Sequence, residues 1–239
     1  MIRVSTAVPL KEDPLTYLPR KPLQEFGKGH EIYSPKHPAD RLYLVVLGRV
    51  KVTTMFEDGY ETIARIVCPE GLFGEAMLVG GRPSEAAVPL DSVTVMSWTR
   101  AEIEQQIERE PHLGIALSQF LVAQCVALQD RIESMAVHKT PERVMVALAQ
   151  LAQTLGTPLP DGATRLASLT HQTIAEYVGT SREIVTFQMN RLKRLGMIRY
   201  TRRYIDVFTT SVENVLRQQG IRVPREQPAE LTHRATGAF

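Results

Sequence analysis

Residues 170–192 read THQTIAEYVGTSREIVTFQMNRL and carry the signals for two short helices joined by a tight turn. Thr170 and Ser181 are residue types that commonly cap helix N-termini. Gly179 tolerates the positive φ that a tight turn needs, and the small Ala175 lets the two helices approach closely. The apolar positions of both helices are expected to form one buried face: Ile174, Val178, Val185, Met189 and Leu192. This pattern predicts a helix-turn-helix.

The second predicted helix places Arg182 and Glu183 in its first turn, pointing away from the buried face. In a helix-turn-helix this turn meets the base edges in the major groove of DNA. Arg can donate two hydrogen bonds to guanine O6 and N7, and Glu can accept one from cytosine N4, so the pair can read adjacent base pairs. An Arg-Glu pair on a helix is also often only solvated, so the neighbouring segments have to support this interpretation.

Two short β runs follow the helices, at 197–200 and 204–208, and predict a hairpin wing with a basic tip. Basic and hydroxyl side chains around a recognition helix contact DNA phosphates, which fixes the position of the protein rather than its sequence preference. We expect phosphate contacts from Thr170, Ser181, Arg191, Arg202 and Arg203.

The charge of the chain is unevenly distributed. The formal net charge is +2 over 239 residues, which by itself does not point to nucleic acid. Residues 1–137 hold 14 Lys and Arg against 18 Asp and Glu, whereas residues 138–223 hold 12 against 6. An acidic N-terminal part and a basic C-terminal part are expected if only the C-terminal part approaches DNA phosphates, although chance partitioning of surface charge would give the same numbers.

The N-terminal part of the chain is rich in short β runs separated by turn signals. The runs are 41–46, 50–55, 62–67, 86–88 and 92–98. Asp58-Gly59, between two of them, is a strong hairpin signal. We therefore predict an antiparallel barrel or sandwich.

From residue 100 the pattern becomes helical, with a short helix to about 109, a break at Pro111 and a long helix to about 137. The long helix carries an apolar stripe at alternating steps of four and three residues: Leu121, Cys125, Leu128, Ile132 and Met135. This is the spacing of a coiled-coil seam, so two such helices are expected to pair across a dimer axis. The alternative is packing on the chain's own β domain, a role for which three residues off the stripe are available: Phe120, Val122 and Val126.

Composition argues against several function classes. No window approaches the roughly 18 uninterrupted apolar residues of a membrane span, and Lys11, Glu12 and Asp13 interrupt any secretory signal, so a cytoplasmic protein without a membrane partner is expected. Cys68 and Cys125 are too few for a disulfide framework or for a cluster held wholly by cysteines. The main enzyme alternative is a cupin-like metalloenzyme. It is not expected, and no metal site is predicted, because the β region lacks His-x-His and His-Glu-x-x-His motifs.

Ser181-Arg182-Glu183-Ile184-Val185 resembles the Ser-Arg-Glu-Thr-Val recognition motif of the cyclic-AMP receptor protein/Fnr (Crp/Fnr) superfamily of bacterial transcription regulators. Gly48-Arg49-Val50-Lys51-Val52 and Phe73-Gly74-Glu75 resemble the β-roll signatures of that family, and the likeness covers about residues 23–210. The resemblance implies an α+β fold, with an N-terminal antiparallel β-roll of the cyclic-nucleotide-binding (jelly-roll) type, a long dimerisation helix and a C-terminal winged helix. It also implies a homodimer that binds a palindromic site in double-stranded DNA and contacts RNA polymerase. The direction of regulation is not set by any sequence pattern.

The resemblance divides the chain into five parts. They are an N-terminal extension (1–22), a β-roll sensor domain (23–110), a long dimerisation helix (111–137), a winged-helix DNA-binding domain (138–223) and a polar tail that we expect to be disordered (224–239). Thr140 is expected to cap the first helix of the DNA-binding domain, with Pro141 at its first position, and that helix is expected to end near Gly156.

The candidate effector pocket departs from the pattern of nucleotide-binding relatives. In these relatives an Arg-Ser or Arg-Thr pair, at the tenth and eleventh residues after the Glu of the Gly-Glu motif, holds the cyclic phosphate. Counting from Glu75 places Glu85-Ala86 there, and a carboxylate would repel the phosphate, although a shifted loop could still present Arg82. The base-contacting Thr-Ser of the long helix falls near Leu128-Gln129. We therefore expect no control by cyclic AMP, and the pocket candidates are Gly74, Glu75, Arg82, Glu85 and Ala86.

The other sensing chemistries of the family are not indicated either. The four-cysteine arrangement of Fnr-type cluster proteins is absent. Haem bound through Cys68, His30 or His37 stays open as an alternative, although an isolated Cys or His in a β-roll is usually structural. Thiol redox chemistry at Cys68 or Cys125 also stays open, although Cys125 on the predicted seam is expected first to act as a small buried hydrophobic residue. No cofactor and no particular small-molecule effector is predicted. A nucleotide-binding module that does not touch DNA is a further alternative, which Arg182-Glu183 disfavours.

Phe187 stands where the family's recognition helix often has a second Arg, four residues after the Glu of the motif. Phe cannot hydrogen-bond to guanine, but it can contact a thymine methyl group or pack against a neighbouring helix. The resemblance therefore predicts a half-site that differs from the usual TGTGA type at that base pair.

Overall fold

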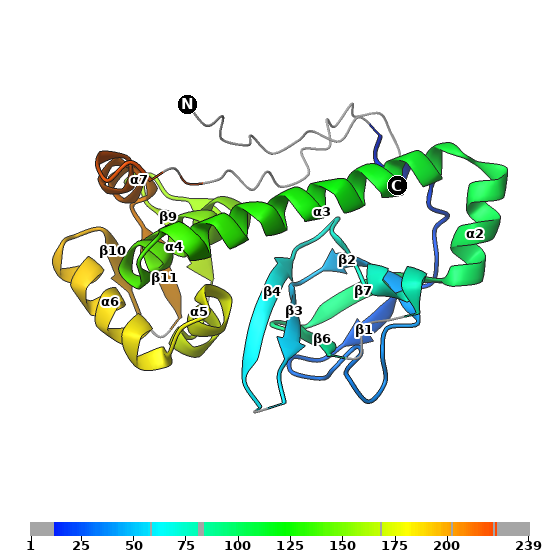
Figure 1. Cartoon of the computed structure of the whole chain (residues 1–239), viewed down its shortest axis with the longest axis horizontal. Helices are drawn as coiled ribbons and strands as arrows, with labels where there is room; N and C mark the ends of the chain where they lie inside the picture. Colours follow the sequence, from blue (N-terminus) through cyan, green and yellow to red (C-terminus); the bar gives the residue numbers. More distant parts are fainter. Residues whose placement is uncertain are drawn as a thin grey trace.

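The computed structural model describes residues 12–57, 59–80, 84–167, 169–201, 203–221 and 223. Figure 1 shows a β-rich N-terminal domain, a long helix that runs along it, and a second domain at the far end of that helix. The N-terminal elements are α1 (Pro14–Tyr17), β1 (Gln24–Phe26), β2 (Arg41–Leu47), β3 (Val50–Met55), β4 (Glu61–Val67), β5 (Leu72–Phe73), the 3-10 helix η1 (Glu75–Val79), β6 (Glu85–Pro89), β7 (Val93–Thr99), α2 (Arg100–Arg109) and α3 (His112–Val137). The second domain contains α4 (Thr140–Leu155), β8 (Gly156–Pro158), β9 (Thr164–Ala167), α5 (His171–Val178), α6 (Arg182–Arg194), β10 (Ile198–Tyr200), β11 (Tyr204–Val207) and α7 (Thr209–Gln218).

Two antiparallel sheets form the N-terminal β-roll, with strand orders β1-β7-β2-β5 and β4-β3-β6. Alternate residues of each strand point inward, so their apolar side chains form the core between the sheets. The Tyr43 and Phe73 rings stack in this core with centroids 5.0 Å apart. All five β runs predicted for this region are strands, with ends within one residue of those expected. Asp58 of the predicted hairpin turn lies outside the described residues, and Gly59 beside it has a φ of +79°.

A second apolar cluster joins the β-roll to α2 and to the start of α3. Trp98 is fully buried in this cluster, and its Nε1 donates a 2.9 Å hydrogen bond to the carbonyl of Pro19. Thr99 and Glu102 cap α2 reciprocally, each accepting from the backbone amide of the other. The remaining buried members of the cluster are Leu42, Leu72, Met77, Ile103, Leu113 and Leu117. The first turns of α3 are therefore fixed to the β-roll, whereas the following turns are more exposed.

The second domain packs its helices on a four-stranded sheet of order β10-β11-β9-β8. Its first helix, α4, begins at Thr140 and has Lys139 in the N-cap position, so the expected cap at Thr140 is wrong by one residue. The reason is that the Glu142 carboxylate accepts a 2.8 Å hydrogen bond from the Lys139 amide, which satisfies the start of the helix without a hydroxyl cap. Gly156 follows the last residue of α4, as predicted.

The sequence did not lead us to expect α7. No side chain caps its N-terminus, where Phe208 occupies the N-cap position. The helix is held by Val212 and Leu216, one turn apart and both fully buried in the core of the second domain. The polar tail, residues 224–239, lies outside the described residues.

By its length and composition alone, α3 could cross a membrane, and only 17% of its most apolar window is buried inside the protein. The helix is nevertheless packed along its side by folded protein. Leu113 and Leu117 are buried against the β-roll near its start, and Arg131 near its end hydrogen-bonds to backbone carbonyls of β4. A bilayer cannot surround a helix held in this way.

Candidate nucleic-acid interface

α5 and α6 form the predicted helix-turn-helix. The hydroxyl of Thr170 accepts a 3.0 Å hydrogen bond from the amide of Thr173, and that of Ser181 accepts one of 3.4 Å from the amide of Ile184. Both capping predictions are therefore confirmed. Gly179 ends α5 with a φ of +72°, which favours glycine. The five apolar residues expected to form the buried face are each no more than 6% exposed.

The opposite face of α6 is open. Arg182 and Glu183 in its first turn are exposed, and the Phe187 side chain one turn later is 61% exposed. Hydrogen bonds from the backbone amide of Glu183 and from the Ser181 hydroxyl hold the pKa of the Glu183 carboxyl below its usual value. Glu183 is thus an ionised acceptor beside a permanent cationic donor, which is the chemistry expected for reading a cytosine next to a guanine.

The wing is fixed to the sheet by a buried carboxylate. Asp206 in β11 is 1% exposed and accepts hydrogen bonds of 2.7 and 2.9 Å from Arg165 in β9 and one of 3.2 Å from Arg199 in β10. The Arg165 guanidinium and, to a lesser extent, the Arg199 guanidinium hold the pKa of this carboxyl below its usual value despite its burial. Arg165 also lies over the Tyr204 ring, 3.8 Å from its centroid. These contacts connect three neighbouring strands and give the hairpin a defined position beside α6.

A groove of about 710 Å³ lies between the helix-turn-helix and the wing. It is lined by Leu169, Thr170, His171, Gln172, Arg182, Tyr200, Thr201 and Ile205. Of these residues, only Thr170 and Arg182 were expected from the sequence to take part in a site. The groove therefore joins a predicted phosphate-binding residue to a predicted base-reading residue.

His171, which the sequence analysis missed, is fixed within this groove. Its Nδ1 lies 3.0 Å from the Thr186 hydroxyl, and its ring meets the edge of Tyr200 with centroids 5.5 Å apart. The Thr186 hydroxyl donates to the carbonyl of Arg182 at 2.8 Å, so its oxygen can accept a hydrogen bond from Nδ1–H. Burial and, to a lesser extent, the positive charge of Arg182 lower the pKa of His171 below its usual value. Its place directly after the capping Thr170 was the signal available in the sequence.

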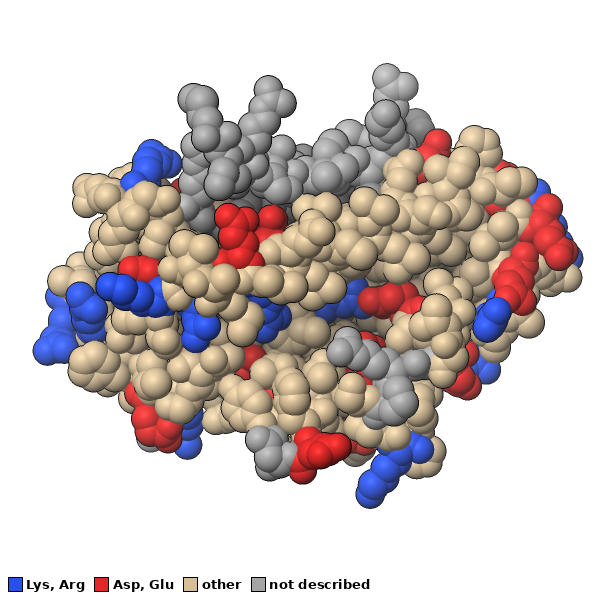
Figure 2. Space-filling view, in the orientation of Figure 1, with Lys and Arg blue, Asp and Glu red and all other residues tan. Residues whose placement is uncertain are grey.

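Positive charge gathers at this end of the molecule, where Figure 2 shows several Lys and Arg side chains on the surface over the second domain. Arg191, Lys193 and Arg203 are exposed. Lys193 Nζ also lies over the Tyr200 ring, 5.0 Å from its centroid. Arg202, expected at the tip of the wing, lies outside the described residues.

The predicted seam of α3 faces away from both domains over most of its length. Leu128, Ile132 and Met135 are 51%, 67% and 49% exposed, Cys125 is exposed and Leu121 is half-buried. Of the residues considered for packing within the chain, Phe120 contacts the Trp98 cluster and Val126 is half-buried. Val122 is 58% exposed, so the role considered for it is wrong. The reason is that Val122 lies on the side of α3 that also exposes Ser118 and Cys125, about one turn before and after it.

The candidate effector pocket holds two carboxylates that already have partners. The Glu75 carboxylate accepts hydrogen bonds of 2.5 and 2.6 Å from Arg65 of β4. The Glu85 carboxylate accepts one of 2.6 Å from the Tyr33 hydroxyl. Both carboxylates and Arg65 act on the pKa of Tyr33, which places the four groups together in the β-roll. Arg82, whose loop was considered as a substitute phosphate ligand, lies outside the described residues.

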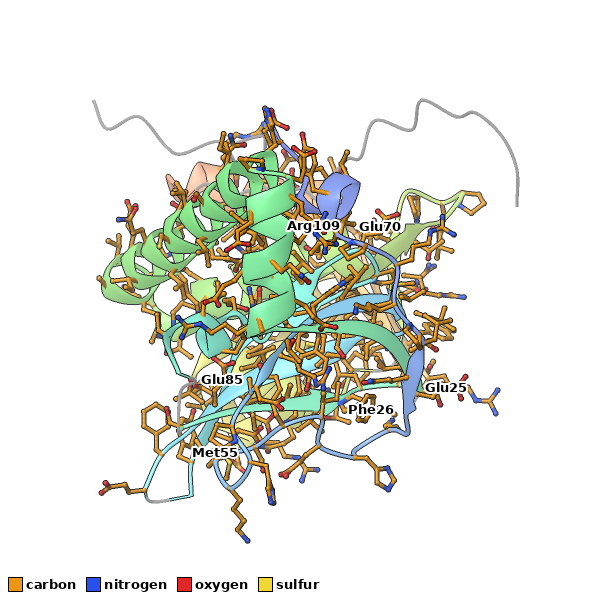
Figure 3. All side chains as sticks on the ribbon, turned by 90° about the vertical axis from the view of Figure 1, so that its right-hand side faces the viewer. Glu25, Phe26, Met55, Glu70, Glu85 and Arg109 are labelled. Carbon is orange, nitrogen blue, oxygen red and sulfur yellow. The ribbon has the colours of Figure 1, made fainter. Side chains whose placement is uncertain are left out.

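The two other pocket candidates have structural constraints of their own. Gly74 has a φ of +83°, and a Cβ there would lie 2.5 Å from the carbonyl oxygen of Arg41, so only glycine fits. Ala86 is buried in β6. Its neighbour Glu85 pairs with Thr54 of β3, and Figure 3 shows Glu85 and Met55 near the same end of these two strands.

The chain is similar to known proteins in both domains. Residues 23–110 match the cyclic nucleotide-binding domain family, and residues 142–209 match the Crp-like helix-turn-helix domain family. The chain is 30% identical over 188 residues to a global nitrogen regulator of Synechocystis, which covers 77% of this chain and 84% of that protein. The chain belongs to the Crp/Fnr family of DNA-binding transcription regulators.

A further relative agrees with the assignment to the Crp/Fnr family, and a solved structure shares the fold. A CRP-like cAMP-activated global transcriptional regulator of Mycobacterium tuberculosis is 30% identical over 177 residues, covering 73% of this chain and 79% of that protein. The crystal structure of a CRP-family transcriptional regulator from Thermus thermophilus superposes with a TM-score of 0.70 at 22% identity, covering 84% of this chain and 98% of that one. The latter likeness shows the fold alone.

Members of the Crp/Fnr family are transcription regulators rather than enzymes. In the part of the chain that the structure describes, no group of three or more His, Cys, Asp or Glu side chains is placed to hold a metal ion. His30 and His37, considered for haem, are exposed, and Cys68 is half-buried. The names of the relatives differ between nitrogen regulation and activation by cyclic AMP, so membership of the family does not name an effector.

Proposed function

We propose that this Crp/Fnr-family regulator acts as a cytoplasmic homodimer that binds a palindromic DNA site, and that its binding does not require cyclic AMP. The observation that carries the DNA-binding part is the open first turn of α6 beside the groove at the wing. A convex helix face with an ionised Arg-Glu pair fits the major groove, and the adjoining groove with its hydroxyl and basic side chains fits the sugar-phosphate backbone.

Each contact has a separate role in this proposal. Arg182 and Glu183 read base edges, and Phe187 contacts a thymine methyl group, because it offers only an apolar surface. The phosphate contacts fix the register of the protein on the duplex and supply the salt-dependent part of the affinity. They come from Thr170, Ser181, Arg191 and Arg203, with Arg202 as a further candidate.

The homodimer is supported by the exposed stripe on α3. Leu128 and Ile132 lie on one line of side chains that neither domain covers, and Met135 at the end of this line is still 49% exposed. A second copy of α3 would remove these side chains from water, and a two-fold axis along the seam would present two α6 helices to two half-sites. RNA polymerase is the further partner that we expect for a regulator bound at a promoter.

Independence from cyclic AMP is supported by Glu85. Its carboxylate, bonded to the Tyr33 hydroxyl, occupies the position at which nucleotide-binding relatives are expected to carry an Arg. A cyclic phosphate bound there would lose its hydration beside the negative charge of Glu85. It would also lack the charge-assisted hydrogen bonds from an Arg that normally offset the cost of this lost hydration.

Selection of bound duplexes from a random DNA pool, with the purified full chain and no added nucleotide, tests the proposed function. The expected result is enrichment of one inverted repeat that wild-type protein binds at least about a thousandfold more tightly than random duplex. Arg182→Ala, carried through the same selection, should lose its preference at one base pair in each half-site. Recovery of no sequence motif by the wild-type protein would contradict the proposal.

A further inference from the structure

Lys51 of β3 connects the β-roll to the helix-turn-helix. Its Nζ donates 3.0 Å hydrogen bonds to Glu61 on the neighbouring β4 and to Glu176 on α5. The side chains of Lys51 and Glu176 are only 15% and 11% exposed, so water screens this pair far less than a surface ion pair. Removal of either partner would leave the other charge shielded and incompletely compensated.

Arg131 of α3 makes a second connection to the same helix. Its Nη1 donates to the carbonyls of Ile63 and Ala64 in β4, each at 2.7 Å, and its Nη2 donates to the carbonyl of Tyr177 in α5 at 2.8 Å. The guanidinium also lies over the Tyr177 ring, 5.4 Å from its centroid. One side chain therefore connects the long helix, the β-roll and the helix-turn-helix through three backbone acceptors. We call Lys51, Arg131 and Glu176 the interdomain clamp.

Apolar contacts surround the clamp. Ile66 of β4 and Leu90, just after β6, pack against the buried core of the second domain. At the end of α3, Met135 Cε lies 3.9 Å from the position that a Cβ would take at Gly179, the turn between α5 and α6. The helix-turn-helix is thus seated against both the β-roll and the long helix (Figure 1).

The clamp does not cover the DNA-reading surface. It holds α5, whereas Arg182 and Phe187 of α6 stay exposed. It also leaves uncovered the α3 side chains Leu128 and Ile132, which the proposed dimer would bury. A contact that leaves both surfaces free, while fixing the elements that carry them, sets the orientation of one surface relative to the other.

We propose that the interdomain clamp is a positioning device, which holds the two recognition helices of the dimer at the separation and orientation of the palindrome without a bound effector. This inference rests on the proposed function. Arg131 and Lys51 do not touch DNA in this account. They act through α5, which packs directly against α6.

The clamp is expected to matter for palindrome binding because the two recognition helices of a dimer are physically connected. Once one recognition helix is bound, the second binds at an effective concentration set by how well its position matches the other half-site. A domain free to turn about the 138–139 connection would lose orientational freedom on binding, whereas a clamped domain has already lost it on folding. Loss of the clamp should therefore weaken binding to two half-sites together much more than binding to one.

The experiment compares the affinity of the full-length protein for its selected palindrome with its affinity for a duplex that carries one half-site. Three variants break the clamp: Arg131→Ala, Lys51→Met and Glu176→Gln. We expect each to lower palindrome affinity by at least about tenfold and to change half-site affinity by less than about twofold. Lys51→Arg keeps a cation between the two carboxylates and should retain the wild-type ratio of the two affinities.

Arg100→Met is the matched control. Arg100 pairs with Glu104 at 2.7 Å within α2, with both side chains more than half exposed and no part in the contact between the domains. This variant removes a cation of the same kind and should bind like wild type. Should Arg131→Ala fold poorly, Lys51→Met and Glu176→Gln still test the inference, because they leave the three backbone contacts of Arg131 in place.

An unchanged ratio of palindrome to half-site affinity in the clamp variants would overturn the inference while leaving the proposed function intact. An equal loss on both duplexes would also overturn it, because it would indicate a purely structural role of the clamp in the stability of the second domain. Wild-type protein that prefers no palindrome would overturn the proposed function and, with it, this inference.

Discussion

The hydroxyl of Tyr33 donates a 2.6 Å hydrogen bond to the carboxylate of Glu85 inside the β-roll. Burial and the nearby carboxylate raise the pKa of Tyr33, so the phenol keeps its proton at any physiological pH. Glu85 thus has a permanent neutral donor and no cation in this bond. The same fold in a nucleotide-binding relative is expected to present an Arg at this point.

The first prediction follows from this pair. Calorimetric titration of the purified protein with cyclic AMP and cyclic GMP should show no micromolar binding, and neither nucleotide should change its affinity for the palindrome. A ligand shifts a conformational equilibrium only through different affinities for the two states, and a pocket that repels the phosphate has little affinity for either. Micromolar binding coupled to a gain of tenfold in DNA affinity, about 1.4 kcal/mol, would show that another group, such as Arg82, binds the phosphate.

The second prediction concerns the seam. Leu128→Glu should dissociate the dimer, because the substitution places two like charges opposite each other in a contact that excludes water. Sedimentation velocity at micromolar concentration measures the change. The control is Gln105→Glu, which adds the same charge at an exposed position of α2. Wild-type protein that sediments as a monomer would contradict the seam itself.

Short-range signals in the sequence predicted much of the fold. Thr170 and Ser181 cap the helices as expected because a cap bonds to an amide only three residues away. Five strands of the β-roll and the two strands of the wing were also predicted from local patterns, whereas the short strands β1, β5 and β8 were not. α7 was missed because the burial of Val212 and Leu216, rather than a cap, defines it.

Contacts between distant residues could not be predicted in this way. Arg131 bonds to carbonyls 67 and 68 residues before it and 46 residues after it, and no local pattern predicts such partners. A cation on the long helix was visible in the sequence, but its binding to α5 was not. His171 belongs to the same class, because its role depends on Thr186 and Tyr200 in two other elements.

The third prediction separates base reading from phosphate binding. Arg182→Ala should cost about 1 to 3 kcal/mol per half-site and relax the preference at one base pair. Arg203→Ala should weaken binding to all sequences alike and reduce the dependence of affinity on salt. Affinities for the palindrome, for a singly substituted palindrome and for random duplex, at three salt concentrations, measure both effects. Equal losses of specific and non-specific binding in Arg182→Ala would show that the assigned roles are wrong.

The fourth prediction concerns the stability of the wing. Asp206→Asn should lower the free energy of unfolding at pH 7 by about 1 to 3 kcal/mol, because a buried carboxylate loses its charge-assisted bonds to Arg165 and Arg199. The pKa of Asp206 is depressed in the folded chain, so its contribution is present above the usual Asp pKa of about 3.9 and is lost as the pH falls further. Urea unfolding at pH 7 and below pH 4 should therefore show a smaller difference between variant and wild type in acid. Asp161→Asn, at an exposed partner of Arg199, should change little.

The last prediction concerns pH and His171, which lines the groove and is expected there as a further phosphate contact. The Thr186 hydroxyl donates to Arg182, so neutral His171 carries its proton on Nδ1 and leaves Nε2 without one. Only the doubly protonated ring can then keep Thr186 and also donate to a DNA phosphate in the groove. In the free protein the pKa of His171 is lowered, so its contribution to stability is present at neutral pH and declines as the pH falls below about 6.5. A bound phosphate has the opposite effect and raises the pKa.

DNA binding should accordingly take up protons. Palindrome affinity should rise by about two- to tenfold between pH 7.5 and pH 6, since linkage limits the gain to tenfold per pH unit for each His171 that titrates. His171→Gln can still donate to a phosphate but cannot titrate, so its affinity should be nearly independent of pH over this range. Calorimetry in two buffers of different ionisation enthalpy measures the proton uptake directly. The same pH dependence in wild type and in His171→Gln would show that His171 does not bind phosphate as an imidazolium.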